Sequence, residues 1–216
     1  MAKHLDLEEQ EQLDQIKHFW ARYGNLITWV LIVVFGSVAA WNGWSYWQRN
    51  QAMKAAALYD EVERAALARD SERLSRTLTD MQASFGRTAF ASQAGLLAAQ
   101  SLQDAGKTDE ARAALTWVTD KGSDDGYKAV ARLRLAALQL DAGAHERAME
   151  LLAAPVPAAF EGLVADRRGD VLMAQGRTED ARAQYQRAWT SLGDRAEYRR
   201  LIEVKLAALG VDASTL

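Results

Sequence analysis

The sequence predicts an all-α protein in which an N-terminal transmembrane helix is followed by an α-solenoid of stacked helical pairs. Three observations favour this fold class. An uncharged apolar stretch lies near the N-terminus, a glycine-centred motif recurs further along, and the 216 residues include only two prolines. Ala, Leu, Arg, Glu and Gln dominate after residue 50. These residue types are strong helix formers, so the composition agrees with the pattern.

The predicted membrane span covers residues 23–48, which contain no charged side chain. A helix needs about 20 apolar residues to cross a bilayer. Amphipathic aromatic side chains favour the membrane interface, and the span has such interfacial anchors at both ends: Trp20, Tyr23, Trp44 and Trp47. Trp44 lies 21 positions after Tyr23, which corresponds to ~31 Å along a helix, close to the ~30 Å of bilayer hydrocarbon.

Two other interpretations of this stretch fit the sequence less well. A cleaved signal peptide could end at the small-x-small triplet Ser37 to Ala39. Signal peptides begin with a basic segment, whereas residues 1–22 are acidic and the apolar run continues to Trp47. A buried helix of a soluble core is rarely apolar on every side for six turns. We therefore expect a retained signal-anchor helix.

The charges flanking the span do not decide its orientation, because Lys17 and Arg22 on one side are matched by Arg49 and Lys54 on the other. A short N-terminal tail and a large C-terminal domain suit an N-terminus in the cytoplasm, because large domains translocate largely regardless of charge. The predicted organisation is an acidic cytoplasmic tail (1–22), the span (23–48) and a domain of residues 49–216.

Small residues recur along one face of the span, at Gly36, Ala40 and Gly43. Such strips allow a second helix to approach closely. They predict a transmembrane partner face, although Gly and Ala are also simply common in spanning helices.

A motif recurs three times after residue 50: GKTDEARAAL (106–115), GAHERAMELL (143–152) and GRTEDARAQYQRAW (176–189). Each copy follows a helix rich in Ala and Leu. The intervals of 37 and 33 residues are close to the tetratricopeptide period of about 34. We predict repeats at about 92–122, 129–155 and 162–193. Residues 50–85 predict a degenerate first pair without the glycine, and residues 196–210 predict a C-terminal capping helix.

Superposing the turn glycines of the repeats predicts a protein-binding groove on the first helix of each pair. A mixture of apolar and polar side chains suits an extended polypeptide, and Leu and Met give adaptable contacts. The same residues could instead be ordinary core. Arg167 and Arg168 could clamp a peptide carboxylate or form ion pairs with neighbouring acids. The predicted groove residues are Leu96, Gln100, Gln103, Leu133, Leu140, Asp166, Asp170 and Met173.

Composition argues against several function classes. The net charge of -3 argues against a dedicated nucleic-acid binder, and the absence of cysteine excludes thiolate nucleophiles and cysteine metal sites. Two of the three histidines precede the span, and the third lies in a repeat turn. We therefore expect no enzyme activity, cofactor, metal or small-molecule substrate.

Several stretches of the chain resemble the YfgM family of ancillary SecYEG translocon subunits. The resemblance rests on the acidic tail, GWSYW (43–47), KAVARLRLAALQ (128–139) and VADRRGDVLMAQGRTEDAR (164–182). It implies a single-pass protein of the bacterial inner membrane with a periplasmic repeat domain. The implied partners are the SecYEG translocon, a PpiD-type periplasmic chaperone and secretory polypeptides, which the protein would help to pass to chaperones. The alternative is a membrane-anchored regulator of stress-response signalling that acts through its cytoplasmic tail.

Overall fold

The computed structural model describes residues 7–193, 196–213 and 216, and in these ranges it contains helices and their connections but no strand. The chain divides into two compact units, Met1–Asn50 and Gln51–Leu216. Helix α1 (Leu7–Leu67) contributes to both. The predicted all-α class is confirmed.

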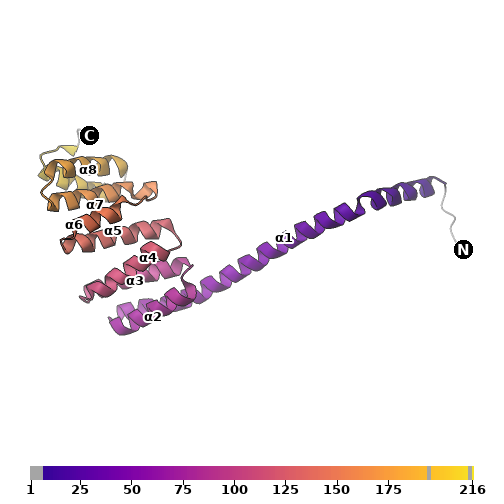
Figure 1. Cartoon of the computed structure of the whole chain (residues 1–216), viewed down its shortest axis with the longest axis horizontal. Coiled ribbons are helices and arrows are strands. Elements are labelled where there is room, and N and C mark those ends of the chain that lie inside the picture. The colour runs from indigo at the N-terminus through magenta and orange to yellow at the C-terminus, as the bar shows by residue number, and fades with distance from the viewer. Residues whose placement is uncertain (1–6, 194–195, 214–215) are drawn as a thin grey trace. The chain divides into compact units, whose positions relative to one another are not determined.

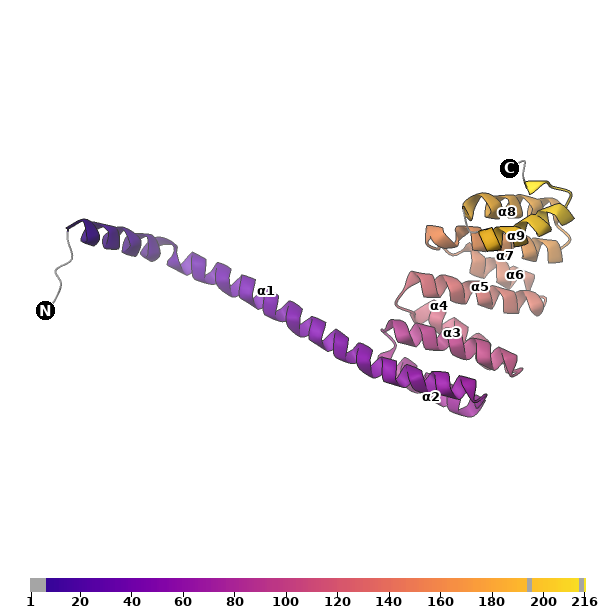
Figure 2. The ribbon, with the colours of Figure 1, turned by 180° about the vertical axis from the view of Figure 1, so that it is seen from behind.

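The second unit is a stack of helices in chain order (Figures 1 and 2). Each of the helices from α3 onward contacts the one before it, and α3, α5 and α7 also contact one another in a row. This is the arrangement of stacked helical pairs that the repeats predict. After the C-terminal part of α1 come α2 (Ser71–Phe85), α3 (Ala89–Asp104), α4 (Thr108–Lys121), α5 (Asp125–Asp141), α6 (His145–Ala153), the 3-10 turn η1 (Ala158–Phe160), α7 (Glu161–Ala174), α8 (Thr178–Ser191) and α9 (Ala196–Ala208).

The glycine motifs form identical turns between paired helices. At Gly176 (φ 72°) the glycine N–H donates to Met173 O at 3.0 Å, and the next N–H, of Arg177, donates to Leu172 O at 2.9 Å. The same two hydrogen bonds recur at Gly106, Gly143 and Gly210. This left-handed helix ending favours glycine, which has no Cβ to clash.

The first pair makes the same turn without glycine. Arg69 has φ 54°, its N–H donates to Ala66 O at 3.0 Å, and the N–H of Asp70 donates to Ala65 O at 3.0 Å. The equivalent turn residues, 69, 106, 143, 176 and 210, are therefore 37, 37, 33 and 34 residues apart. The repeat begins one pair earlier than its glycines indicate, and the turn at Gly210 ends the terminal helix.

The core runs through the stack as three clusters of buried side chains, the first spanning α1 to α5, the second α5 to α7, and the third α7 to α9. The C-terminal part of α1 joins the first cluster through Val62 and through Tyr59, whose ring centroid lies 5.9 Å from that of Phe90. The last part of α1 is thus the first helix of the repeat domain.

Paired helices approach closely at glycine, since a Cβ on Gly169 would lie 2.3 Å from the Tyr185 ring.

Candidate membrane anchor and protein-binding surface

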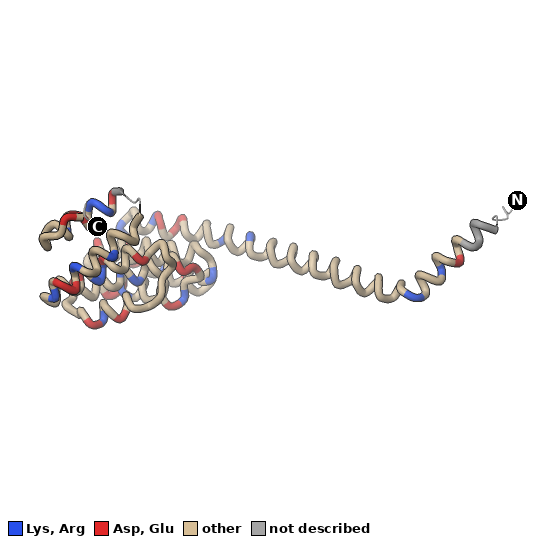
Figure 3. Tube along the Cα trace, turned by 90° about the horizontal axis from the view of Figure 1, so that it is seen from above, with Lys and Arg blue, Asp and Glu red and all other residues tan. Residues whose placement is uncertain are grey.

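Helix α1 carries no charged residue between Arg22 and Arg49 (Figure 3). Among the described residues it is the one helix long and apolar enough to cross a membrane. The rings of Phe19 and Tyr23 lie 5.1 Å apart at one end of this stretch, and those of Trp44 and Trp47 lie 5.4 Å apart at the other. Trp20 is also exposed beside the first pair.

Two hydroxyl groups in the span bond to the helix itself. The Oγ1 of Thr28 donates to Gly24 O at 2.8 Å, and the Oγ of Ser37 donates to Val33 O at 2.7 Å. In hydrocarbon no water can satisfy such groups, so polar groups must pair within the protein. These two side chains are therefore compatible with lipid on all sides.

The strip of small residues in the span is open. A Cβ added at Gly36 or Gly43 would meet no atom within 4 Å, and Ala40 between them is exposed. The strip therefore has room for an approaching helix, and its role as a partner face stays a prediction.

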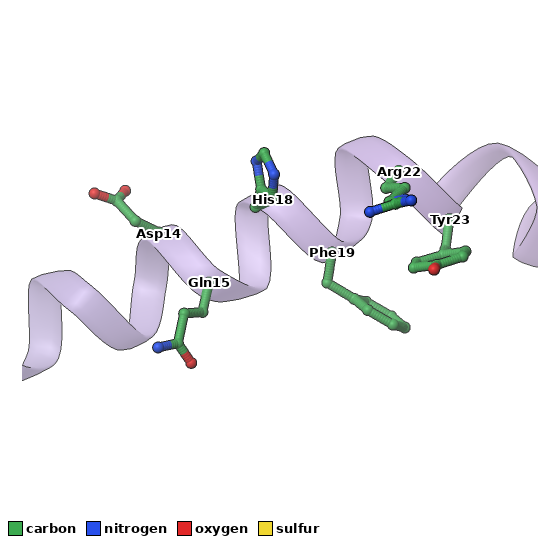
Figure 4. A pocket seen from close by; sticks show the side chains of 6 residues that line it. All are labelled: Asp14, Gln15, His18, Phe19, Arg22 and Tyr23. Atoms are coloured by element: carbon green, nitrogen blue, oxygen red, sulfur yellow. The ribbon is translucent and has the colours of Figure 1, made fainter.

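The tail before the span has two different sides (Figure 4). Asp14 and His18 project on one side, whereas Gln15 and Phe19 project on the other. The guanidinium carbon of Arg22 lies 5.8 Å from the centroid of the Tyr23 ring. The aromatic side continues into the aromatic group at the start of the span. The tail is thus a helical continuation of the anchor helix, with Gln15 and Phe19 on the same side.

Five of the predicted groove residues are at least partly accessible on the row of helices α3, α5 and α7, although Leu133 and Leu140 also pack against a core cluster. Gln100 and Gln103 are exposed, Met173 is 38% exposed, and Leu133 and Leu140 are half-buried. Polar and apolar side chains are therefore available on the first helices of the pairs, as a polypeptide-binding surface requires.

The structure places the other three predicted groove residues in the interior or in bonded clusters. Leu96 is only 9% exposed and belongs to the first core cluster. Asp166 is 1% exposed and accepts hydrogen bonds from Tyr198 Oη (2.7 Å) and Lys205 Nζ (2.6 Å). Asp170 also accepts from Lys205 Nζ, at 2.6 Å. Their assignment to an open groove is corrected, because these side chains are already packed in the core or hydrogen-bonded to residues of neighbouring helices.

These carboxylates form what we call the α7–α9 network, in which side chains from α7, α8 and α9 meet. Tyr185 on α8 donates to Asp170 at 2.9 Å. Burial, and then the negative charge of Asp170, raises the pKa of the Tyr185 phenol. Burial, and then the hydrogen bond to Asp166, raises the pKa of Tyr198. Both phenols are therefore neutral donors. The members of the network are Asp166, Asp170, Tyr185, Tyr198 and Lys205.

The sequence contained a signal for this network that glycine spacing does not reveal. Lys205 shares a helical face with Ile202 and Leu206, which are fully buried. A lysine on an apolar face requires a buried carboxylate partner. Asp166, beside the buried Ala165, is the matching acid.

The two adjacent arginines of α7, Arg167 and Arg168, bond to different partners. Arg167 pairs with Asp170 at 3.3 Å, which is the ion-pair alternative, whereas Arg168 Nη2 donates to Leu152 O at 2.7 Å. Because the two arginines have different partners, they are not arranged as one joint clamp for a peptide carboxylate. Across the described ranges, no group of three or more His, Asp or Glu side chains is arranged to hold a metal ion.

Comparison with known proteins agrees with this organisation. A family model described as a tetratricopeptide repeat-like domain matches residues 17–211. The chain is 30% identical over 213 residues to the ancillary SecYEG translocon subunit of Neisseria gonorrhoeae, covering 97% of this chain and 100% of that protein. It is 26% identical over 178 residues to the protein of the same name from Escherichia coli, covering 82% and 85%. No solved structure matches the chain significantly. The chain therefore belongs to the tetratricopeptide repeat-like family of ancillary SecYEG translocon subunits.

Proposed function

We propose that this protein is a membrane-anchored interaction subunit of the Sec translocon, which acts by binding and carries out no chemical step. The supporting observation is the match to a relative named ancillary SecYEG translocon subunit over that protein's full length. The match includes both the apolar stretch of α1 and the repeats. In this proposal the span holds the repeat domain beside the channel, and tethering raises the local concentration of weakly binding partners.

The proposal places the N-terminal tail in the cytoplasm and the repeat domain in the periplasm. The small tail and large C-terminal unit support this orientation. Because the chain has no cysteine, single cysteines at His18 and Asp109 can be labelled in intact cells with an impermeant maleimide. Labelling at position 109 and protection at position 18 are expected, and the opposite pattern would reverse the orientation.

The accessible side chains of α3, α5 and α7 bind emerging secretory polypeptides in this proposal and help to pass them to periplasmic chaperones of the PpiD type. Gln100 and Gln103 offer hydrogen bonds, and Met173 offers a flexible apolar contact. Such a surface suits many extended sequences, because its contacts do not require one side-chain pattern.

Site-specific photo-crosslinking tests this role. A crosslinker at Gln100 or Met173 is expected to capture a secretory chain stalled in the translocon, and one at exposed Thr116 on α4 serves as the control. Equal capture at Thr116 would contradict the binding surface. Copurification of SecYEG without capture at any of these positions would contradict the transfer role and leave the translocon association intact.

A further inference from the structure

A hollow of about 210 Å³ lies where α6 ends. Helix α6 has 9 residues, whereas α4 and α8 have 14. Pro155 and Pro157 follow α6 directly, and proline has no N–H to continue a helix. The shortened helix leaves space against α7 and α8. We call this space the Arg168 pocket, and its walls include Leu152, Pro155, Val156, Val164, Arg168 and Arg187.

Arginine side chains from two neighbouring helices fix the rim of the Arg168 pocket. Arg132 on α5 donates to Pro155 O at 3.0 Å, and Arg168 on α7 donates to Leu152 O at 2.7 Å. Both acceptors lie in the segment where α6 ends. The hollow is therefore bounded by a bonded loop and two helices.

Two positive charges line the pocket without an acidic partner. Arg168 and Arg187 form no ion pair with any residue that the structure describes, and Glu161, which also lines the pocket, pairs with neither. Burial lowers the pKa of Arg168, and the charge of Arg187 lowers it further. Arg168 is half-buried and Arg187 is exposed. Like charges at such a site repel each other, so a bound anion would stabilise the pair.

The rest of the lining favours an anion that carries an apolar group. Leu152, Val156 and Val164 supply apolar walls. A guanidinium offers forked N–H donors that match the two oxygens of a carboxylate. The volume is below the roughly 300 Å³ at which pockets for drug-sized ligands begin. A chain end meets all three conditions, because its carboxylate and last side chain are close together.

We propose that the Arg168 pocket binds the C-terminal carboxylate of a partner polypeptide whose last residue is apolar. Arg168 and Arg187 hold the carboxylate, and the apolar walls hold the last side chain. An internal acidic side chain would leave those walls uncovered. The site is separate from the accessible residues of α3, α5 and α7, and it does not depend on translocon association.

Fluorescence anisotropy with the full-length protein in detergent micelles tests the site. The probe is a fluorescein-labelled hexapeptide ending in a free leucine, and the matched peptide ends in an amide. The amide is expected to bind at least about ten-fold more weakly, because it lacks the charge that the arginines bind. Arg187→Ala should weaken binding of the free acid by a similar factor. Arg87→Ala removes the same charge from the turn between α2 and α3 and should have no effect.

Arg187 makes no side-chain hydrogen bond or ion pair with the described residues, so its replacement should leave the circular dichroism spectrum unchanged. Four results would each overturn the proposal: no binding of the free acid, equal binding of the amide, an equal loss in Arg87→Ala, or equal binding of an amidated peptide with an internal glutamate. Complete displacement by millimolar inorganic phosphate would also overturn it, because the site would then be a general anion site.

Discussion

Lys205 joins two carboxylates of α7, with its Nζ 2.6 Å from an oxygen of Asp166 and 2.6 Å from an oxygen of Asp170. The Asp166 side chain is 2% exposed. Removing one partner of a buried ion pair leaves an uncompensated charge, which costs far more than losing an exposed pair. At the scale of single residues, this lysine therefore adds a buried ion pair to the apolar contacts of Ile202 and Leu206 that attach α9 to the stack.

Replacing Lys205 should strongly destabilise the repeat domain. Lys205→Met is expected to lower the free energy of unfolding by about 3–5 kcal/mol, because Asp166 loses its buried cation. Arg147→Met removes the exposed pair with Glu150 and should cost less than about 1 kcal/mol. Urea denaturation followed by circular dichroism measures both. Equal losses would show that the buried pair has no special role.

The buried phenol of Tyr185 and the half-buried phenol of Tyr198 predict a loss of stability at high pH. Their pKa values are raised in the folded protein, whereas an unfolded tyrosine titrates near pH 10. Above about pH 10 the unfolded chain releases these protons first, so the free energy of unfolding falls as pH rises. The double variant Tyr185→Phe, Tyr198→Phe should lose stability less steeply there than the wild type.

Below about pH 9 neither phenol ionises, so the same double variant should be less stable than the wild type through its lost hydrogen bonds, by about 1 kcal/mol each. Urea denaturation at a series of pH values separates the two effects. Parallel pH profiles for the variant and the wild type would contradict the raised pKa values.

At the scale of elements, one turn geometry joins α1 to α2, α3 to α4, α5 to α6 and α7 to α8. Its cost in stability depends on the residue at the left-handed position. Arg69 adopts φ 54° there, whereas Gly176 occupies the equivalent position at φ 72°. A Cβ at Gly176 would meet no atom within 4 Å. A substitution at this position therefore reports on backbone conformation and not on packing.

Substitutions at the left-handed positions of these two turns should have opposite effects on stability. Arg69→Gly should stabilise the repeat domain by about 0.5–1 kcal/mol, and Gly176→Ala should destabilise it by about 1 kcal/mol. Thermal unfolding of both variants beside the wild type measures the pair. Destabilisation by Arg69→Gly would mean that its side chain contributes more than its backbone conformation costs.

The same elements show what the sequence could and could not predict. Helix-forming composition and the glycines at 106, 143 and 176 predicted the helical pairs correctly, because both are local properties. The first pair was predicted from its helical composition alone, but the left-handed turn at Arg69 was not, because no glycine marks it. Asp166 was placed in the groove by repeat position alone. Its partner Lys205 lies 39 residues away, and such a pairing follows from how helices pack, which spacing does not reveal.

At the scale of the whole molecule, the anchor and the repeat domain carry different parts of the proposed function. The first unit presents an uncharged helix with an open strip of small residues, and the second presents accessible side chains on a stacked core. Substitutions in one unit should therefore leave the other function intact.

Gly43→Leu should weaken association with membrane partners several-fold while insertion continues, because the larger side chain blocks close helix approach at the strip. Ser45→Leu makes a similar change on the opposite side of the helix, two residues on, and should leave association unchanged. Copurification of SecYEG measures association, and carbonate extraction measures insertion. Equal copurification by Gly43→Leu and the wild type would reduce the span to a simple anchor.

The turn at Gly210 has a consequence for how the chain can lengthen. In the earlier repeats this turn leads from the first helix of a pair into the second, whereas here it follows α9, the last helix that the structure describes. A duplicated segment of about 34 residues, inserted directly after Gly210, would keep every register and every turn. Helix α9 would then become the first member of a new pair. The length of the repeat domain can therefore grow in whole modules by tandem duplication, without redesign of its existing end.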